Sequence, residues 1–116
     1  MKIAELIEKL DLEVVCPPSD PETAVQSACV SDLLSNVMAT CPGNSVWITS
    51  QGHTNVIGVA SLLDVQAVIL AGCATPDESV QCKARDTGVT LLRTPDNAFD
   101  LCGKLYALGI RGQTRE

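Results

Sequence analysis

The sequence predicts a three-layer α/β/α domain with a small, mostly parallel or mixed sheet, and three observations indicate this fold class. Short segments rich in β-branched and apolar residues alternate with segments of about ten residues at helical spacing. Residues 65–71 are almost wholly apolar, which is typical of a strand buried on both faces. Hydrophobic residues make up 46% of the 116 residues, enough for the core of a single domain spanning 1–116.

The first three elements follow from the spacing of apolar residues and from the prolines. Apolar side chains recur at helical spacing over residues 2–10 and predict an amphipathic helix. Residues 12–16 predict a strand that ends at two consecutive prolines. Residues 23–30, in which apolar and polar side chains alternate loosely, predict a second strand.

The segment that follows predicts a helix capped by Ser31 or Asp32, because a side-chain oxygen there can accept from a free backbone N–H. Its expected buried stripe consists of Leu33, Leu34, Val37 and Met38. A turn over 41–44 ends this helix. β-branched and aromatic residues then predict a strand over 45–50, with Trp47 as an anchor in the core or at an interface.

The remaining predicted elements are a helix over 55–64, the buried strand over 65–71, a helix over 77–87, a strand over 89–93 and a final helix from 95 to 108. Asn55 is expected to cap the first of these helices, and Gly88 to end the second. Pro95 is expected in the first turn of the last helix, where proline is tolerated best. The polar tail, residues 111–116, is expected to fray.

The charge distribution excludes several function classes. The net charge is −6, and the chain contains no Lys or Arg between Lys9 and Lys83. Such a chain cannot neutralise a nucleic-acid backbone, and phosphoryl transfer normally needs Lys or Arg to offset developing charge. No apolar run approaches the roughly 20 residues of a membrane span, and nothing resembles a secretory signal. We expect a soluble, cytoplasmic protein that binds neither nucleic acid nor a membrane.

The cysteines are expected to be ordinary thiols. The six are Cys16, Cys29, Cys41, Cys73, Cys82 and Cys102. No C-x-x-C pair occurs, and consecutive cysteines lie at least nine positions apart, so neither a metal site nor a disulfide framework is indicated. Free cysteine behaves as a small hydrophobic residue, which predicts core or surface thiols, no metal and no cofactor.

Several segments together carry a resemblance to a known family. They read SDLLS, WITSQGHTNVIGVASLLD, LYALGI and VQAVILAGCATPDESVQCKARDTGVTLLRTPDNAF. With these in their order and spacing, the chain resembles a stand-alone DRTGG-domain protein over nearly its whole length. The last segment is similar to the N-terminal domain of HPr kinase/phosphorylase. The Asp-Arg-Thr-Gly-Gly string itself is absent, and its nearest counterpart is residues 71–75, which lack the arginine.

The resemblance implies a regulatory or sensing module that self-associates as a dimer and that is not an enzyme. Relatives of this domain accompany CBS domains in nucleotide-regulated proteins, where other domains perform the chemistry. The catalytic P-loop of HPr kinase lies in a separate domain, and this chain contains no G-x-x-x-x-G-K-[ST] segment. Kinase activity is therefore not carried over.

Ligands of open α/β sheets gather at the carboxyl ends of strands, beside helix N-termini. This rule selects the loops around Ser31, around His53 and at 72–76. The predicted ligand-binding residues are Asp32, His53, Thr54, Asn55 and Gly72. Arg85 and Arg93 are the basic residues that a second subunit could add.

Each of these residues also has a simpler interpretation. His53, the only histidine, is expected to take part in turn chemistry at the lip of the site by bonding local backbone. Asp32 is expected to be a helix cap, although it could also face His53 across adjacent strand ends. No nucleophile–base pair can be read from the sequence, so no catalytic residue is predicted.

The best reading is therefore a non-catalytic regulatory domain that binds a small molecule or nucleotide. Two alternatives remain open. The chain could be a protein-interaction subunit of a redox (hydrogenase-type) system without a ligand, which a large exposed apolar patch would mark. It could also be a metal or thiol sensor, which predicts bound metal or a cysteine of low pKa.

Overall fold

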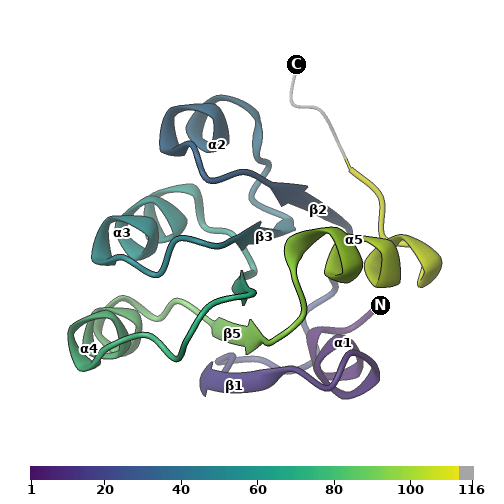
Figure 1. The fold of residues 1–116 in the computed structure, drawn as a ribbon, viewed down its shortest axis with the longest axis horizontal. Helices are drawn as coiled ribbons and strands as arrows, with labels where there is room; N and C mark the ends of the chain where they lie inside the picture. Colours follow the sequence, from purple (N-terminus) through teal and green to yellow (C-terminus); the bar gives the residue numbers. More distant parts are fainter. Residues whose placement is uncertain (113–116) are drawn as a thin grey trace.

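The computed structural model describes residues 1–112 and places a five-stranded mixed sheet between two layers of helices (Figure 1). In chain order the elements are α1 (Ile3–Lys9), β1 (Glu13–Cys16), β2 (Ser27–Val30), α2 (Leu34–Thr40), β3 (Ser45–Thr49), α3 (Thr54–Leu63), β4 (Ala67–Ala71), α4 (Glu78–Thr87), β5 (Leu91–Thr94) and α5 (Ala98–Ala107). The predicted α/β/α fold class is confirmed. The polar tail predicted to fray lies, in its last four residues, outside the described part of the chain.

The strand order is β1-β5-β4-β3-β2, so β4 lies in the middle of the sheet and β1 and β2 form its edges. β2, β3, β4 and β5 are parallel, whereas β1 pairs antiparallel with β5 through Glu13–Arg93 and Val14–Leu92. Every residue of β3 and β4 is buried, because helices cover both faces of the sheet. The carboxyl ends of the four parallel strands therefore meet at one edge.

Two apolar clusters fill the space between the layers. On one face, residues from α1 and α5 pack against alternate residues of the strands, including Ile48 and Ile69. On the other face, residues from α2, α3 and α4 pack against the intervening residues, including Trp47 and Val68. Figure 1 shows α2, α3 and α4 stacked along one side and α1 with α5 on the other. Trp47 is completely buried, which confirms its expected place in the core.

The predicted strand over 23–30 begins only at Ser27. The residues before it pair with the start of the chain: the backbone N–H of Ile3 donates to the Thr23 carbonyl at 2.8 Å, and that of Val25 donates to the Met1 carbonyl at 2.7 Å. This pairing takes the backbone groups that a longer strand would use in the sheet.

α2 differs from its predicted form. Of its residues only Val37 is buried, while Leu33 is 64% exposed and Met38 42% exposed. The expected stripe is confirmed for Val37 and for the partly buried Leu34, which packs against the core, and is wrong for Leu33 and Met38. The seven-residue helix lies over the edge of the sheet, where few strand residues remain to be covered.

The predicted end of α4 is confirmed, whereas the predicted start of α5 is wrong. Gly88 ends α4 with φ of 73°, as predicted, and the Asp77 side chain caps its start by accepting from the Val80 N–H. Pro95 is not in the first turn of α5, which begins at Ala98. Asn97 caps α5 instead by accepting from the Asp100 N–H at 2.8 Å, and a side-chain acceptor defines a helix start better than proline does.

Candidate functional site

A cavity of about 340 Å³ lies at the carboxyl ends of β2 and β3, between the starts of α2 and α3. Its lining residues are Asp32, Leu33, Leu34, Ser35, Gln51, His53, Asn55 and Val56. Three of the five predicted ligand-binding residues, Asp32, His53 and Asn55, thus share one cavity. The two adjacent loops meet here because parallel neighbouring strands end at the same edge of the sheet.

Asp32 joins the ends of the two strands rather than capping a helix. Its carboxylate accepts from the Thr49 hydroxyl at 2.7 Å, from the Ser50 N–H at 2.9 Å and from the Ser50 hydroxyl at 2.8 Å. The Ser50 N–H bond, followed by the Thr49 and Ser50 hydroxyl bonds, lowers the pKa of Asp32 below its ordinary value. An ionised Asp32 therefore holds the β2–α2 loop against the end of β3.

The predicted cap of α2 by Ser31 or Asp32 is wrong. The N-cap is Leu33, and no side chain bonds to the helix start there. Ser31 Oγ instead accepts from the Leu33 N–H at 3.1 Å and from the Asn36 side-chain amide at 3.2 Å. Asp32 is drawn away from the helix because three donors from β3 and its following loop compete for its oxygens.

His53 is the N-cap residue of α3, so the predicted cap by Asn55 is wrong. Its carbonyl accepts from the Val56 N–H at 3.1 Å, but its exposed imidazole makes no cap bond. The imidazole therefore does not perform the predicted turn chemistry and is available to the cavity. It also lies near the start of α4: after Ser79 and Val80, which act most strongly, positive charge on His53 helps to lower the pKa of Asp77.

Thr54 and Gly72 do not line the cavity. The Gly72 N–H donates to the Thr94 carbonyl at 3.1 Å, and a Cβ on Gly72 would lie 3.4 Å from the Asn97 Cα. The loop at 72–76 therefore packs against the β5–α5 connection. The loop at 72–76 follows β4, which lies one strand beyond β3 in the sheet, so it is separated from the loops that follow β2 and β3.

The cavity offers polar groups of several kinds on an apolar floor. Gln51 and Asn55 contribute amides, Ser35 a hydroxyl and His53 an imidazole, while leucines and a valine supply the apolar surface. No side chain caps the start of α3, and the N-cap residue His53 belongs to the lining of the cavity. No Lys or Arg belongs to the lining of this cavity. The chemistry suits a planar, hydrogen-bonding group better than an unscreened polyphosphate.

The two arginines considered as a charge supply are already paired. Arg93 contacts Glu13 at 2.7 Å and donates to the Cys73 carbonyl at 2.9 Å. Arg85 contacts Glu78 at 3.0 Å along α4. Neither lines the cavity.

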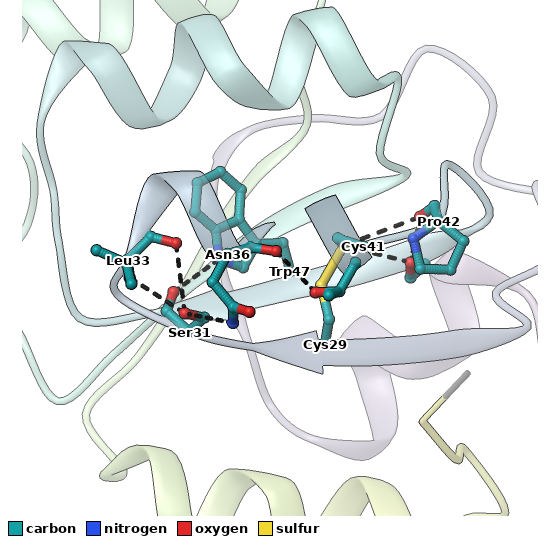
Figure 2. Close-up of a disulfide and its surroundings, with 9 residues drawn as sticks. Cys29, Ser31, Leu33, Asn36, Cys41, Pro42 and Trp47 are labelled. Carbon is teal, nitrogen blue, oxygen red and sulfur yellow. Dashed lines mark hydrogen bonds between the residues drawn. A yellow bond between two sulfur atoms is a disulfide. The ribbon is translucent and has the colours of Figure 1, made fainter. Parts of the chain in front are cut away.

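The prediction that all cysteines are free thiols is wrong for two of them. Cys29 on β2 and Cys41 at the end of α2 form a disulfide, with their Cα atoms 6.0 Å apart (Figure 2). Beside it, the Trp47 indole N–H donates to the Ser31 carbonyl at 2.9 Å. A separation of 12 residues matches no familiar cysteine motif, so only the packing of α2 over β2 brings the two sulfurs together.

The other cysteines, Cys16, Cys73, Cys82 and Cys102, are free. Burial raises the pKa of Cys16, Cys73 and Cys102. Within residues 1–112, no group of three or more His, Cys, Asp and Glu side chains is placed to hold a metal ion. In the same range, none of the helices is long and apolar enough to cross a membrane.

The architecture is that of an α/β domain with a candidate ligand cavity at its strand ends, and comparison with known proteins makes the class narrower. No protein-family model matches the sequence, and no curated protein matches it. Among solved structures, the chain is similar to the CBS and DRTGG domains of the regulatory region of Clostridium perfringens pyrophosphatase, a structure complexed with the activator diadenosine tetraphosphate.

The TM-score of this match is 0.75 at 14% sequence identity, over 90% of this chain and 45% of that chain. The chain thus spans less than half of the length of the pyrophosphatase regulatory region. At this identity the likeness shows the fold, and the protein has a DRTGG-like α/β fold. The match gives no support to the expected similarity to the N-terminal domain of HPr kinase/phosphorylase.

Proposed function

We propose that this chain is a non-catalytic regulatory domain that binds an adenine nucleotide or a related small molecule in the cavity between α2 and α3. The single observation that carries the proposal is the meeting of Asp32, His53 and Asn55 in one cavity at the carboxyl ends of β2 and β3. The pyrophosphatase region of the same fold was solved with a dinucleotide activator, which suggests the class of ligand to test first.

The geometry favours contact with the base and sugar of a nucleotide. An apolar floor and two amides suit a heteroaromatic ring, and the start of α3 suits one phosphate group. Asp32 would not repel that phosphate strongly, because three donors already screen its carboxylate. A role as catalytic base is disfavoured for the same reason, since those donors lower the pKa of Asp32.

The experiment is a calorimetric titration of the full chain with AMP, ATP and diadenosine tetraphosphate. His53→Ala and Asn55→Ala are each expected to weaken binding by about 5- to 100-fold, because each removes a polar contact from a largely preformed cavity. Gln26→Ala is the control, since this amide is exposed before β2 and contacts Asn44 rather than the cavity. Unchanged affinities in both cavity variants would move the ligand site elsewhere.

A second candidate function is protein–protein contact, including the predicted homodimer. The observation favouring it is the exposure of two apolar side chains beside the β2 edge of the sheet, beyond the point where Arg111 pairs with Ala28. Val30 on β2 is 55% exposed and Tyr106 on α5 is 60% exposed. Both line a small groove of about 190 Å³. Native mass spectrometry of the wild type and of Val30→Ser tests the dimer, with Leu62→Ser on α3 as the matched exposed control. A monomer in every sample would rule it out.

A further inference from the structure

We propose that the Cys29–Cys41 disulfide is a redox control on the candidate site: its reduction releases the end of α2 and loosens one wall of the cavity. The effect on ligand binding rests on the function proposed above. The effect on α2 itself does not, and can be measured without any ligand.

One whole wall of the cavity lies inside the loop that the disulfide closes. The half-cystines are 12 residues apart, and the lining residues between them are Asp32, Leu33, Leu34 and Ser35. The opposite wall, from Gln51 to Val56, lies outside the loop. The redox state of the two sulfurs therefore acts on one side of the cavity and not on the other.

Other contacts hold α2 only weakly at its far end. The helix has seven residues, lacks a side-chain cap and buries only Val37 within its own length. Helices of this length are unstable unless tertiary contacts hold them. Figure 2 shows the disulfide crossing from the end of α2 to β2, where it adds a covalent cross-link to the main-chain connections of this helix.

The near end of the segment is held by different bonds, which reduction leaves intact. Trp47 donates to the Ser31 carbonyl at 2.9 Å, and Asp32 accepts from Thr49 at 2.7 Å. We therefore expect reduction to free residues 37–41 and to loosen residues 33–36, which Ser31 still bonds at Leu33 and Asn36, while Ser31 and Asp32 stay on β3. The loosened part includes both leucines of the cavity floor.

A dithiol reductant supplies the two electrons and two protons that reduce the Cys29–Cys41 disulfide by thiol–disulfide exchange. Cys29 is partly buried on the edge strand, whereas Cys41 is fully buried, so the attacking thiolate reaches the Cys29 sulfur first. The S–S bond breaks, Cys41 leaves as a thiolate and takes a proton, and a mixed disulfide forms at Cys29. The second thiol of the reductant then displaces Cys29 and closes the reductant's own disulfide. A small-molecule disulfide such as oxidised glutathione reverses both steps.

Hydrogen–deuterium exchange followed by mass spectrometry tests the proposal on the full chain, oxidised with glutathione disulfide or reduced with dithiothreitol. Reduction is expected to speed exchange by at least about 5-fold in peptides covering 33–41, the lower end of typical coupling between sites. Peptides covering β4 should not change, because the core strand lies outside the loop. Cys82→Ser, which removes a thiol from α4, should retain the full redox response.

Two results would overturn the proposal: equal exchange of 33–41 in both redox states, or thiols of Cys29 and Cys41 that glutathione disulfide fails to join. The variant Cys29→Ala/Cys41→Ala should behave like reduced protein under both conditions. If that variant does not fold, the reduced wild type still decides the question. Nucleotide affinity should fall by about 5-fold or more on reduction. Absence of binding in both states would refute the proposed function, while the exchange data would still judge the redox effect.

Discussion

The Thr49 hydroxyl donates to the Asp32 carboxylate across 2.7 Å and so joins the carboxyl ends of two neighbouring parallel strands. Thr49 is buried, and Asp32 lies at the surface, so the bond runs from the core to the rim of the cavity. Asp32 is thereby a positioning residue for the site wall, and several of its properties can be tested.

Asp32→Ala is expected to lower the free energy of unfolding by about 1–2 kcal/mol. The change leaves the buried Thr49 hydroxyl without its acceptor. The expected loss of unfolding free energy is modest because solvent screens the exposed carboxylate. Urea unfolding followed by Trp47 fluorescence measures the effect. Asp86→Ala, an exposed carboxylate on α4, should change stability by less than about 0.5 kcal/mol. Equal losses in both variants would contradict the role given to Asp32.

The hydrogen bonds to Asp32 should also make the stability of the protein depend on pH in the acid range. Hydrogen bonding lowers the folded-state pKa of Asp32 below the value of about 3.9 found in unfolded chains. Its contribution is therefore present above pH 4 and is lost as pH falls through the folded pKa. Asp32→Asn should flatten the decline of stability between about pH 5 and pH 2. Parallel curves for the wild type and the variant, measured by urea unfolding at each pH, would count against the prediction.

The disulfide should be worth about 2–3 kcal/mol to the folded state, because it closes a loop whose ends are 12 residues apart. Unfolding in urea with and without dithiothreitol measures this difference. Cys82→Ser should show the same shift on reduction as the wild type. A shift below about 0.5 kcal/mol would mean that α2 is held by its remaining contacts alone.

The half-buried thiols of Cys73 and Cys102 should alkylate slowly. Burial raises the pKa of both, so at pH 8 they form less thiolate than a cysteine in the unfolded chain. Iodoacetamide labelling followed by peptide mass spectrometry should show rates that rise several-fold in urea. Faster labelling in the native protein would revive the thiol-sensor alternative for these residues.

Gly88 gives a clean test of the fold. Its φ of 73° strains any larger side chain, although no atom within 4 Å blocks a Cβ there. Gly88→Ala should cost about 1 kcal/mol from backbone conformation alone. The matched change Gly103→Ala, inside α5 and equally unobstructed, should stabilise by about 0.5–1 kcal/mol. Thermal unfolding of both variants would show opposite shifts, and shifts of the same sign would contradict the assigned conformations.

Local patterns predicted most of the fold and part of the site. The buried strand β4 and the α4 boundaries at Asp77 and Gly88 could be read from apolar runs and cap chemistry, because these features are local. The sharing of a cavity by Asp32 and His53 followed from the rule on strand ends. The role of Asp32 in joining two strand ends could not be predicted from the sequence, since its donors lie 17 and 18 residues further along the chain. The disulfide was missed for the same reason, because its partners meet only through packing.

The position of β1 has a consequence for the order of folding. β1 precedes β2 in the chain but lies at the opposite edge of the sheet, where Glu13 contacts Arg93 across 80 residues. The four parallel strands can assemble from neighbouring segments, whereas β1 must wait for β5 at the far end of the chain. Distant pairings form late because the intervening loop must first be closed at a large cost in entropy. We therefore expect β1 to dock last during refolding and to open first in the native state.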